Sequence, residues 1–174
     1  MSRGTGSPDP APARADRRSV TLRPERDDDR ELLCELYGST RADELAQVPW
    51  SDEEKQRFVR FQFEAQRRFY REHYAGATFE IIEVDGAPAG RLYVAEWSRE
   101  IRLMDVALLP AYRGRGIGTT LLHDLQARAG AAGKPLSVHV ERFNPALRLY
   151  QRLGFRAIED KGVYLLLEWR SQLG

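Results

Sequence analysis

The stretch from Glu100 to Gly130 constrains the fold more than any other part of the chain. It begins with EIRLMDVALLP, which is typical of a β-strand. Glycines at positions 114, 116 and 118 follow and open a helix with one apolar face, formed by Ile117, Leu121, Leu122, Leu125 and Ala129. The apolar run LSVHV comes next. A strand, a helix and a strand in this order predict a crossover and a parallel strand pair.

The residues before this stretch predict a strand, two or three helices and a hairpin. SVTLRP reads as a strand that Pro24 closes, and Asp27 and Gly38 bracket a helix with an apolar face. STRADELAQVPW predicts a short helix or turn before Pro49. Ser51 and Glu54 have capping-box spacing and open a long helix from about Asp52 to Tyr74. TFEIIEV and APAGRLYVAEW then form a hairpin around Asp85-Gly86.

The residues after the crossover predict one more helix and a second hairpin. NPALRLYQRLG has proline in its first turn and glycine at its end, as helices do. FRAIED and VYLLLEW then pair around Lys161-Gly162. The order of elements predicts an α+β domain, with a mixed sheet flanked by helices.

Composition excludes several classes of protein. The chain has 174 residues, of which 42% are apolar and 30% charged, so we expect one globular domain over residues 18–174. Residues 1–17 are rich in Gly, Pro, Ser and Ala, and we expect a disordered leader there. A net charge of +1 gives no nucleic-acid footprint. We find no apolar run of the ~20 residues that a membrane helix needs, and no signal peptide, so we expect a cytoplasmic protein.

The glycine loop is built to bind an anion, although a simple strand-to-helix turn is the alternative. A dinucleotide fingerprint needs glycine where Thr119 stands, and no Gly-Lys-Ser or Gly-Lys-Thr follows for a P-loop. Glycines let backbone N–H groups converge at the positive end of a helix. Arg113 and Arg115 could add charge-assisted hydrogen bonds.

Two motifs together resemble the GNAT superfamily of acetyl-CoA-dependent N-acetyltransferases. Arg113-Gly114-Arg115-Gly116-Ile117-Gly118 is similar to its Arg/Gln-x-x-Gly-x-Gly/Ala loop, and NPALRLYQRLGF is similar to its Asn, Ala, Leu-Tyr and Gly-Phe signature. The order of elements resembles that acyl-CoA N-acyltransferase fold from Val20 to Trp169, with about seven mostly antiparallel strands and a central parallel pair.

The resemblance implies a set of residues that bind acetyl-CoA, with no metal. The loop would hold the pyrophosphate through its backbone N–H groups, the strand before it would bond the pantetheine arm, and the N–H of Val106 would polarise the thioester carbonyl. Asn144 would contact the pantetheine, or cap the helix that follows. The implied cofactor-binding residues are Val106, Ala107, Leu108, Arg113, Gly114, Arg115, Gly116, Ile117, Gly118, Thr119 and Asn144.

Tyr150 and Asp105 are the catalytic candidates. Tyr150 takes the place of the family's tyrosine near the cofactor sulfur, where a phenol could protonate the leaving thiolate; its alternative role is packing. Asp105 lies just before the cofactor-binding residues and is our first choice as general base; its alternative is an ion pair with one of the arginines. Glu141 and His139 are the next candidates. The single cysteine, Cys34, excludes an intramolecular disulfide and reads as a core residue.

The acceptor, meaning the amine that receives the acetyl group, is expected beside the long helix. Two apolar stripes follow that helix: Phe58, Phe61, Ala65 and Phe69, and then Val59, Phe63, Tyr70 and Tyr74. Gln62 and Gln66 lie between the stripes and could bind a polar acceptor or nearby backbone. Trp50 and Glu44, with Arg41 and Asp43, are further candidates, although capping and surface charge explain the last three equally well.

These expectations combine into one function and one rival. We expect direct attack of a primary amine, from a small molecule or a peptide, on the thioester of acetyl-CoA. The rival is a non-catalytic acyl-CoA-binding or regulatory module on the same fold. We expect neither a nucleic-acid nor a membrane partner, and a homodimer is possible.

Overall fold

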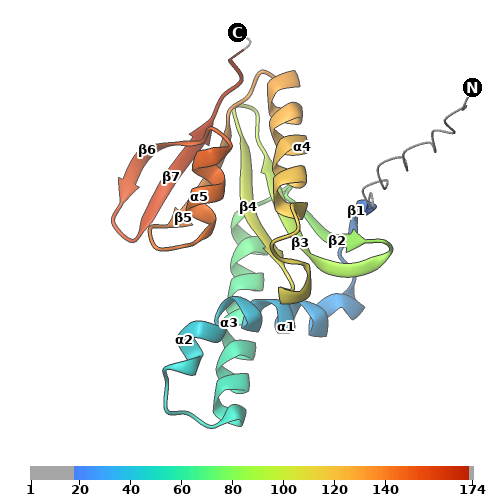
Figure 1. Ribbon diagram of the computed structural model, residues 1–174, viewed down its shortest axis with the longest axis vertical. Helices are drawn as coiled ribbons and strands as arrows, with labels where there is room; N and C mark the ends of the chain where they lie inside the picture. Colours follow the sequence, from blue (N-terminus) through green and yellow to red (C-terminus); the bar gives the residue numbers. More distant parts are fainter. Residues whose placement is uncertain (1–17, 173–174) are drawn as a thin grey trace, which may run out of the picture.

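Seven strands form one mixed sheet in the computed structural model, which describes residues 18–172 (Figure 1). The order across the sheet is β1-β2-β3-β4-β5-β7-β6. β4 and β5 pair in parallel, and the other neighbouring strands pair antiparallel, so the predicted fold class is confirmed. The strands are β1 (Val20–Pro24), β2 (Thr78–Val84), β3 (Ala87–Glu96), β4 (Ile101–Leu108), β5 (Leu136–Glu141), β6 (Arg156–Lys161) and β7 (Tyr164–Trp169).

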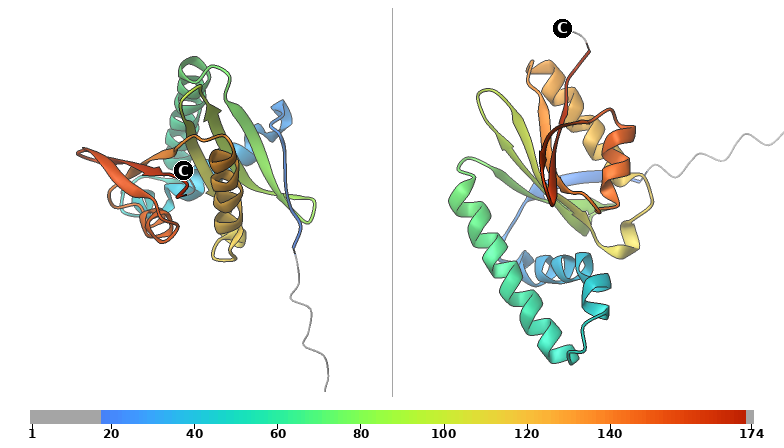
Figure 2. Two further views of the ribbon diagram at one scale, coloured as in Figure 1. Left: turned by 90° about the horizontal axis from the view of Figure 1, so that it is seen from above. Right: turned by 90° about the vertical axis from the view of Figure 1, so that its left-hand side faces the viewer.

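Helices cover both faces of this sheet (Figure 2). One apolar cluster joins α4 and α5 to inward-facing strand residues such as Leu92 and Val138, and a second joins α1 and α3 to the opposite face through Ile81. The helices are η1 (Asp27–Asp29), α1 (Arg30–Thr40), α2 (Ala42–Ala46), α3 (Asp52–His73), η2 (Pro110–Tyr112), α4 (Ile117–Ala131) and α5 (Ala146–Arg152). None of the helices in residues 18–172 combines the length and the apolar character of a membrane span. The expected leader, residues 1–17, lies outside the described residues.

Local signals in the sequence predict where α3 begins and where the β2–β3 hairpin turns. Ser51 Oγ accepts from the N–H of Glu54 at 3.2 Å, and Glu54 Oε2 accepts from the N–H of Ser51 at 2.7 Å, so the predicted capping box opens α3. Asp85 and Gly86 have φ of 52° and 81°, the left-handed pair that a tight hairpin turn requires.

The predicted ends of α1 were wrong. A 3₁₀ turn occupies Asp27–Asp29, and α1 begins only at Arg30. Asp29 Oδ2 accepts from the N–H of Arg26, the N-cap of this turn. Gly38 does not end the helix, which runs on to Thr40. The hydroxyls of Ser39 and Thr40 donate to the carbonyls of Leu36 and Tyr37 at 2.7 Å. These bonds give partners to carbonyls that the end of a helix leaves unpaired.

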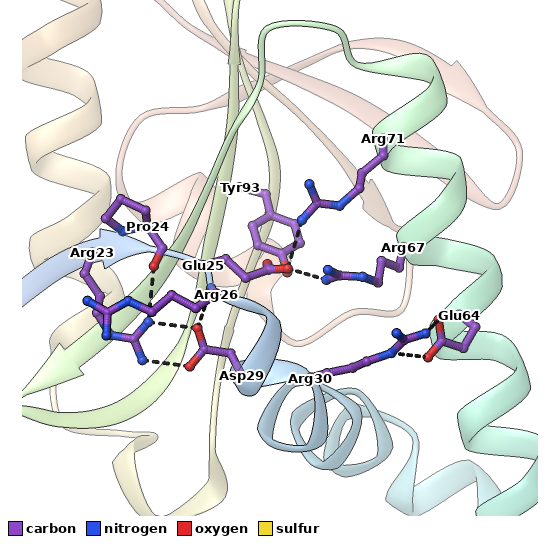
Figure 3. A network of polar contacts seen from close by, with 10 residues as sticks. All are labelled: Arg23, Pro24, Glu25, Arg26, Asp29, Arg30, Glu64, Arg67, Arg71 and Tyr93. Carbon is purple, nitrogen blue, oxygen red and sulfur yellow. Dashed lines mark hydrogen bonds and ion pairs between the residues drawn. The ribbon is translucent and has the colours of Figure 1, made fainter.

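Charged side chains attach α3 to the rest of the domain (Figure 3). The carboxylate of Glu25, whose side chain is 1% exposed, pairs with Arg67 and Arg71 of α3 and accepts from the hydroxyl of Tyr93 at 2.5 Å. Arg30 of α1 binds Glu64 of α3 at 2.6 Å. Of the residues in α3, Phe63 alone is fully buried, so polar contacts carry much of the attachment of this helix.

The two apolar stripes of α3 have different surroundings. Val59, Phe63, Tyr70 and Tyr74 lie toward α1 and the sheet, and Phe63 and Val59 belong to the second apolar cluster. The stripe of Phe58, Phe61, Ala65 and Phe69 is instead exposed, with 70% of Phe61 open to solvent.

Gly90 allows β3 to approach β4 closely, which gives a test of the fold. A Cβ at Gly90 would lie 2.1 Å from the carbonyl oxygen of Ala107, so Gly90→Ala forces the strands apart. We expect a loss of about 1–3 kcal/mol in the free energy of unfolding, measured by urea denaturation. Gly130→Ala in α4 is the control, because its Cβ meets Ser171 at an ordinary 3.5 Å and helix propensity favours alanine. Equal stabilities of the two variants would contradict this packing.

Candidate functional site

The site begins where β4 and β5 part. Their parallel pairing covers only Ile101–Leu103 against Leu136–Val138, after which β5 continues beside β7 and β4 beside β3. The pairing of β3 with β4 jumps from Tyr93–Asp105 to Val94–Leu103, so a bulge at Met104 sits at the point of divergence. The second half of β4 therefore lacks a strand partner on its β5 side.

The register shows which backbone groups face this open side. The N–H of Leu109 donates to the carbonyl of Ala89 at 2.8 Å, toward β3. Because successive residues of an antiparallel strand alternate their N–H direction, Ala107 also points toward β3, whereas Val106 and Leu108 point away from it. Arg113 Nε donates to the carbonyl of Leu108 at 2.9 Å, which agrees with that direction. The backbone of Val106 and Leu108 can thus bond a third, extended chain.

The glycine loop leads from this strand into α4 with its N–H groups unpaired. Gly114 and Gly116 have φ of 70° and 78°, and Gly116 is the N-cap of α4. Within the described chain, the N–H of Thr120 is the first of the helix to reach a carbonyl, and the N–H groups of Gly114 to Thr119 have no partner. A helix start with free donors is suited to a phosphate group, so the loop fits the diphosphate of coenzyme A.

The two loop arginines behave differently. The guanidinium of Arg113 is committed to the carbonyl of Leu108 and, at 2.9 Å, to Ser39 Oγ of α1, and its N–H donates to the carbonyl of Pro110. Arg113 therefore braces the loop against β4 and α1. Arg115 is exposed and lies over the ring of Tyr112, 6.0 Å from its centre, where it can reach an anion at the loop.

Tyr150 of α5 is buried and keeps its proton. It is 4% exposed and its ring lies 5.4 Å from that of Phe155, yet its hydroxyl has no hydrogen-bond partner among residues 18–172. Burial, with the charge of Asp105 adding to it, raises the pKa of the phenol well above its usual range. A protonated hydroxyl without a partner is available as a donor.

Asn144 stands one residue before Pro145, the N-cap of α5. Its Oδ1 accepts from the N–H of Ala146, the first residue of the helix, at 2.9 Å, and so bonds one of the free N–H groups at the helix start. The amide nitrogen of Asn144 makes no hydrogen bond in the described part of the chain. This bond at the helix start and a contact of the amide nitrogen with a bound molecule are therefore compatible.

Asp105 lies in a polar cluster beneath α3. Its Oδ2 accepts from Arg91 Nη2 of β3 at 2.7 Å and from the hydroxyl of Tyr70 at 3.3 Å. Arg91 Nη2 also donates to Gln66 Oε1 at 2.8 Å, so this candidate joins the same cluster. The ion-pair alternative for Asp105 is thus present in the structure, while its Oδ1 stays free of partners among residues 18–172.

His139 is held as a neutral hydrogen-bond donor. Arg102 Nη1 lies 3.1 Å from its Nδ1, and because guanidinium only donates, Nδ1 must accept and Nε2 carries the proton. Burial, with the charge of Arg102 adding to it, lowers the pKa of the imidazole. Glu141, on the same strand face, accepts from the Tyr164 hydroxyl at 3.4 Å and lies 4.0 Å from Arg41.

The other acceptor candidates lie apart from this cluster or make few contacts. Gln62 is half-buried, with no hydrogen-bond partner among the described residues. Trp50 is 41% exposed and packs edge-on against Phe58 at 5.3 Å. Glu44 pairs with Arg41 at 3.2 Å. Asp43 is exposed in α2.

Two members of the polar cluster, Arg91 and Tyr70, were missed from the sequence. Arg91 left a detectable signal, because it is the one charged residue in the segment AGRLYVA. Cys34 is 7% exposed, and burial raises the pKa of its thiol, as a core cysteine requires. Within residues 18–172 no group of three or more His, Cys, Asp or Glu side chains gathers as metal ligands would.

Comparisons with known proteins agree with this geometry. Residues 34–155, well over half of the chain, match the acetyltransferase (GNAT) family model. Streptothricin acetyltransferase of Streptomyces lavendulae is 35% identical over 83 residues, which cover 45% of this chain and 43% of that protein's length. The chain therefore matches less than half of this curated relative.

Solved structures show the same fold. The PaiA N-acetyltransferase of Thermoplasma acidophilum, crystallised with coenzyme A, superposes with a TM-score of 0.67 at 19% identity over 88% of this chain and 99% of that one. An acetyltransferase of Thermus thermophilus gives 0.64 at 19% identity, over 88% and 97% of the two chains. With its parted central strands, its open glycine loop and the family match, this chain belongs to the GNAT acetyltransferase family.

Proposed function

We propose that this protein is an acetyl-CoA-dependent N-acetyltransferase in which a primary amine attacks the thioester directly. The observation that carries the proposal is the set of unpaired backbone N–H groups at Val106 and Leu108 of β4 and from Gly114 to Thr119 at the start of α4. This backbone offers donors for an amide-containing arm and then for a diphosphate, the two parts of coenzyme A. The names of the curated relative and of the coenzyme A complex support the same reading.

The residues of the chain would divide the chemistry between them. Bound acetyl-CoA supplies an acetyl thioester, whose carbonyl carbon is open to attack. The N–H of Val106 would donate to the carbonyl oxygen as negative charge develops there. Asp105 would take a proton from the incoming ammonium through its free Oδ1, and Tyr150 would give its proton to the departing thiolate.

The acceptor would approach from the side of α3, where Gln62, Gln66 and the Asp105 cluster lie, and would be a small-molecule or peptide amine. Direct transfer needs no cysteine intermediate, and Cys34 is buried among apolar side chains. The cytoplasmic location, the single domain and a homodimer stay predictions. The roles of Trp50 and Glu44 in acceptor binding also stay predictions.

An assay of thiol release tests the proposal against its rival. Purified protein with acetyl-CoA is mixed with a panel of amines, and free thiol and acetylated product are measured by colorimetry and mass spectrometry. An N-acetyltransferase releases thiol in step with acetylated amine. A protein that binds acetyl-CoA tightly but releases no thiol with any amine would instead be the acyl-CoA-binding module.

The glycine loop can be tested with an isosteric pair of variants. Asparagine and aspartate both tolerate the left-handed conformation of Gly116, and a side chain there meets no atom within 4 Å. Gly116→Asp adds a negative charge against the diphosphate, so we expect it to bind coenzyme A at least about tenfold more weakly than Gly116→Asn. Calorimetry measures both affinities, with melting curves to confirm folding. Equal affinities would remove the diphosphate from this loop.

The acid role of Tyr150 predicts a loss of turnover without a loss of binding. Tyr150→Phe keeps the ring against Phe155 and removes only the hydroxyl, so turnover should fall by roughly 10²-fold while affinity for acetyl-CoA stays the same. Steady-state kinetics and calorimetry separate the two quantities. A fully active phenylalanine variant would leave Tyr150 with a packing role.

The base role of Asp105 predicts a change in pH dependence. Asp105→Asn cannot accept a proton, so the rate should fall and the acidic limb of the kcat/KM profile should disappear. Coenzyme A affinity is the control. If the variant loses stability but its folded fraction turns over normally, the carboxylate serves the Arg91 ion pair, and Glu141 or a water chain is the next candidate for the base.

A further inference from the structure

The ion pair of Arg91 with Asp105 is asymmetric. The Arg91 side chain is 4% exposed and that of Asp105 is 16% exposed, so the carboxylate is the more open partner of the pair. One nitrogen, Nη2, makes both bonds of Arg91 in the described chain: to Asp105 Oδ2 at 2.7 Å and to Gln66 Oε1 at 2.8 Å. The hydroxyl of Tyr70 approaches the same Oδ2. One carboxylate oxygen is therefore crowded with donors and the other has none.

Stability alone explains Arg91 poorly. A buried ion pair is often no more stable than apolar residues of the same volume, because both ions lose their hydration. Arg91 also leaves its Nε buried with no partner among the described residues. Such an orphaned donor is a cost to folding. A buried, incompletely satisfied cation beside a partly exposed carboxylate is typical of a functional site.

We propose that Arg91 is a positioning residue for acetyl transfer: it holds the Asp105 carboxylate with Oδ2 bound and Oδ1 free, and it links this carboxylate to α3 through Gln66. The inference rests on the proposed function, in which Oδ1 takes the proton of the amine. Gln66 then acts through Arg91. The contact thereby holds α3, the helix beside which the acceptor is expected, at a fixed position relative to the carboxylate of Asp105.

The groups that face Asp105 come from three elements. Tyr70 lies on α3, Arg91 and Tyr93 on β3, and Tyr150 on α5. Burial, with the charge of Asp105 contributing, raises the pKa of each of the three tyrosines above its usual range. These phenols stay neutral at physiological pH, so Arg91 is the member of the group that supplies positive charge.

Gln66→Glu is the most direct test, since it changes one atom's chemistry next to Arg91. The new carboxylate would compete for Nη2 and add negative charge near Asp105, which favours protonation of Asp105. We expect the acidic limb of kcat/KM to move to higher pH by about one unit. The Asp105 carboxyl signal, followed by ¹³C NMR, should titrate at correspondingly higher pH. Gln56→Glu, the same change at an exposed position of α3, should move neither.

Arg91→Lys and Arg91→Met extend the test to the arginine itself. Lysine keeps the positive charge and should hold the acidic limb near its wild-type position, whereas methionine should move it to higher pH. If Arg91 only stabilised the fold, both variants would have a lower folded fraction, and the acidic limb of the kcat/KM profile would stay at its wild-type pH. If Arg91→Met does not fold, the comparison of Gln66→Glu with Gln56→Glu still decides.

The two proposals fail in different ways. An Asp105 signal that titrates identically in wild type and Gln66→Glu overturns the role of Arg91, whether or not turnover is found. Absence of turnover with every amine, together with a shifted Asp105 titration, overturns acetyl transfer and leaves the control of Asp105 by Arg91 intact.

Discussion

The divergence of β5 from β4 after three paired residues is the constraint on which the site depends. A half-buried strand edge needs partners for its backbone groups, and here the sheet leaves the N–H groups of Val106 and Leu108 open. Such an edge is suited to an extended ligand that supplies the missing partners. The bulge at Met104 and the brace from Arg113 to the carbonyl of Leu108 fix the edge in this state.

The two faces of the sheet at the divergence of β4 and β5 bear different groups. On one face, α4 and α5 bring the unpaired loop and the phenol of Tyr150 to the end of β4. On the other, α3 brings Tyr70 and Gln66 onto the cluster around Asp105. The charge of Asp105 helps to keep the phenol of Tyr150 protonated although the two residues come from separate elements. In the proposed mechanism, proton acceptor and proton donor therefore act from opposite sides of one strand.

The sequence predicted the fold well where the determinants are local. The Ser51–Glu54 box, the Asp85-Gly86 turn and the apolar faces of α4 and the strands act within a few residues of each other. The end of α1 was mispredicted because the hydroxyls of Ser39 and Thr40 outweighed the glycine at 38. The spacing of apolar residues predicted both stripes of α3. Which stripe is buried depends on α1 and the sheet, which are distant in the sequence. Arg91 was missed for the same reason: its partners, Gln66 and Asp105, lie far from it in the sequence.

The ion pairs along α3 form a gradient of shielding. At Arg60–Glu31 both side chains are more than half exposed, at Arg30–Glu64 the glutamate is 29% exposed, and at Arg67–Glu25 the glutamate is 1% exposed. Dissolved salt screens the first pair strongly and the last one weakly. The ion pair at Arg60 lies in the first half of α3, and the pair at Arg67 lies nearer to the end beside Asp105. Added salt therefore weakens the contact of Arg60 with Glu31 of α1 more than the contact of Arg67 with Glu25.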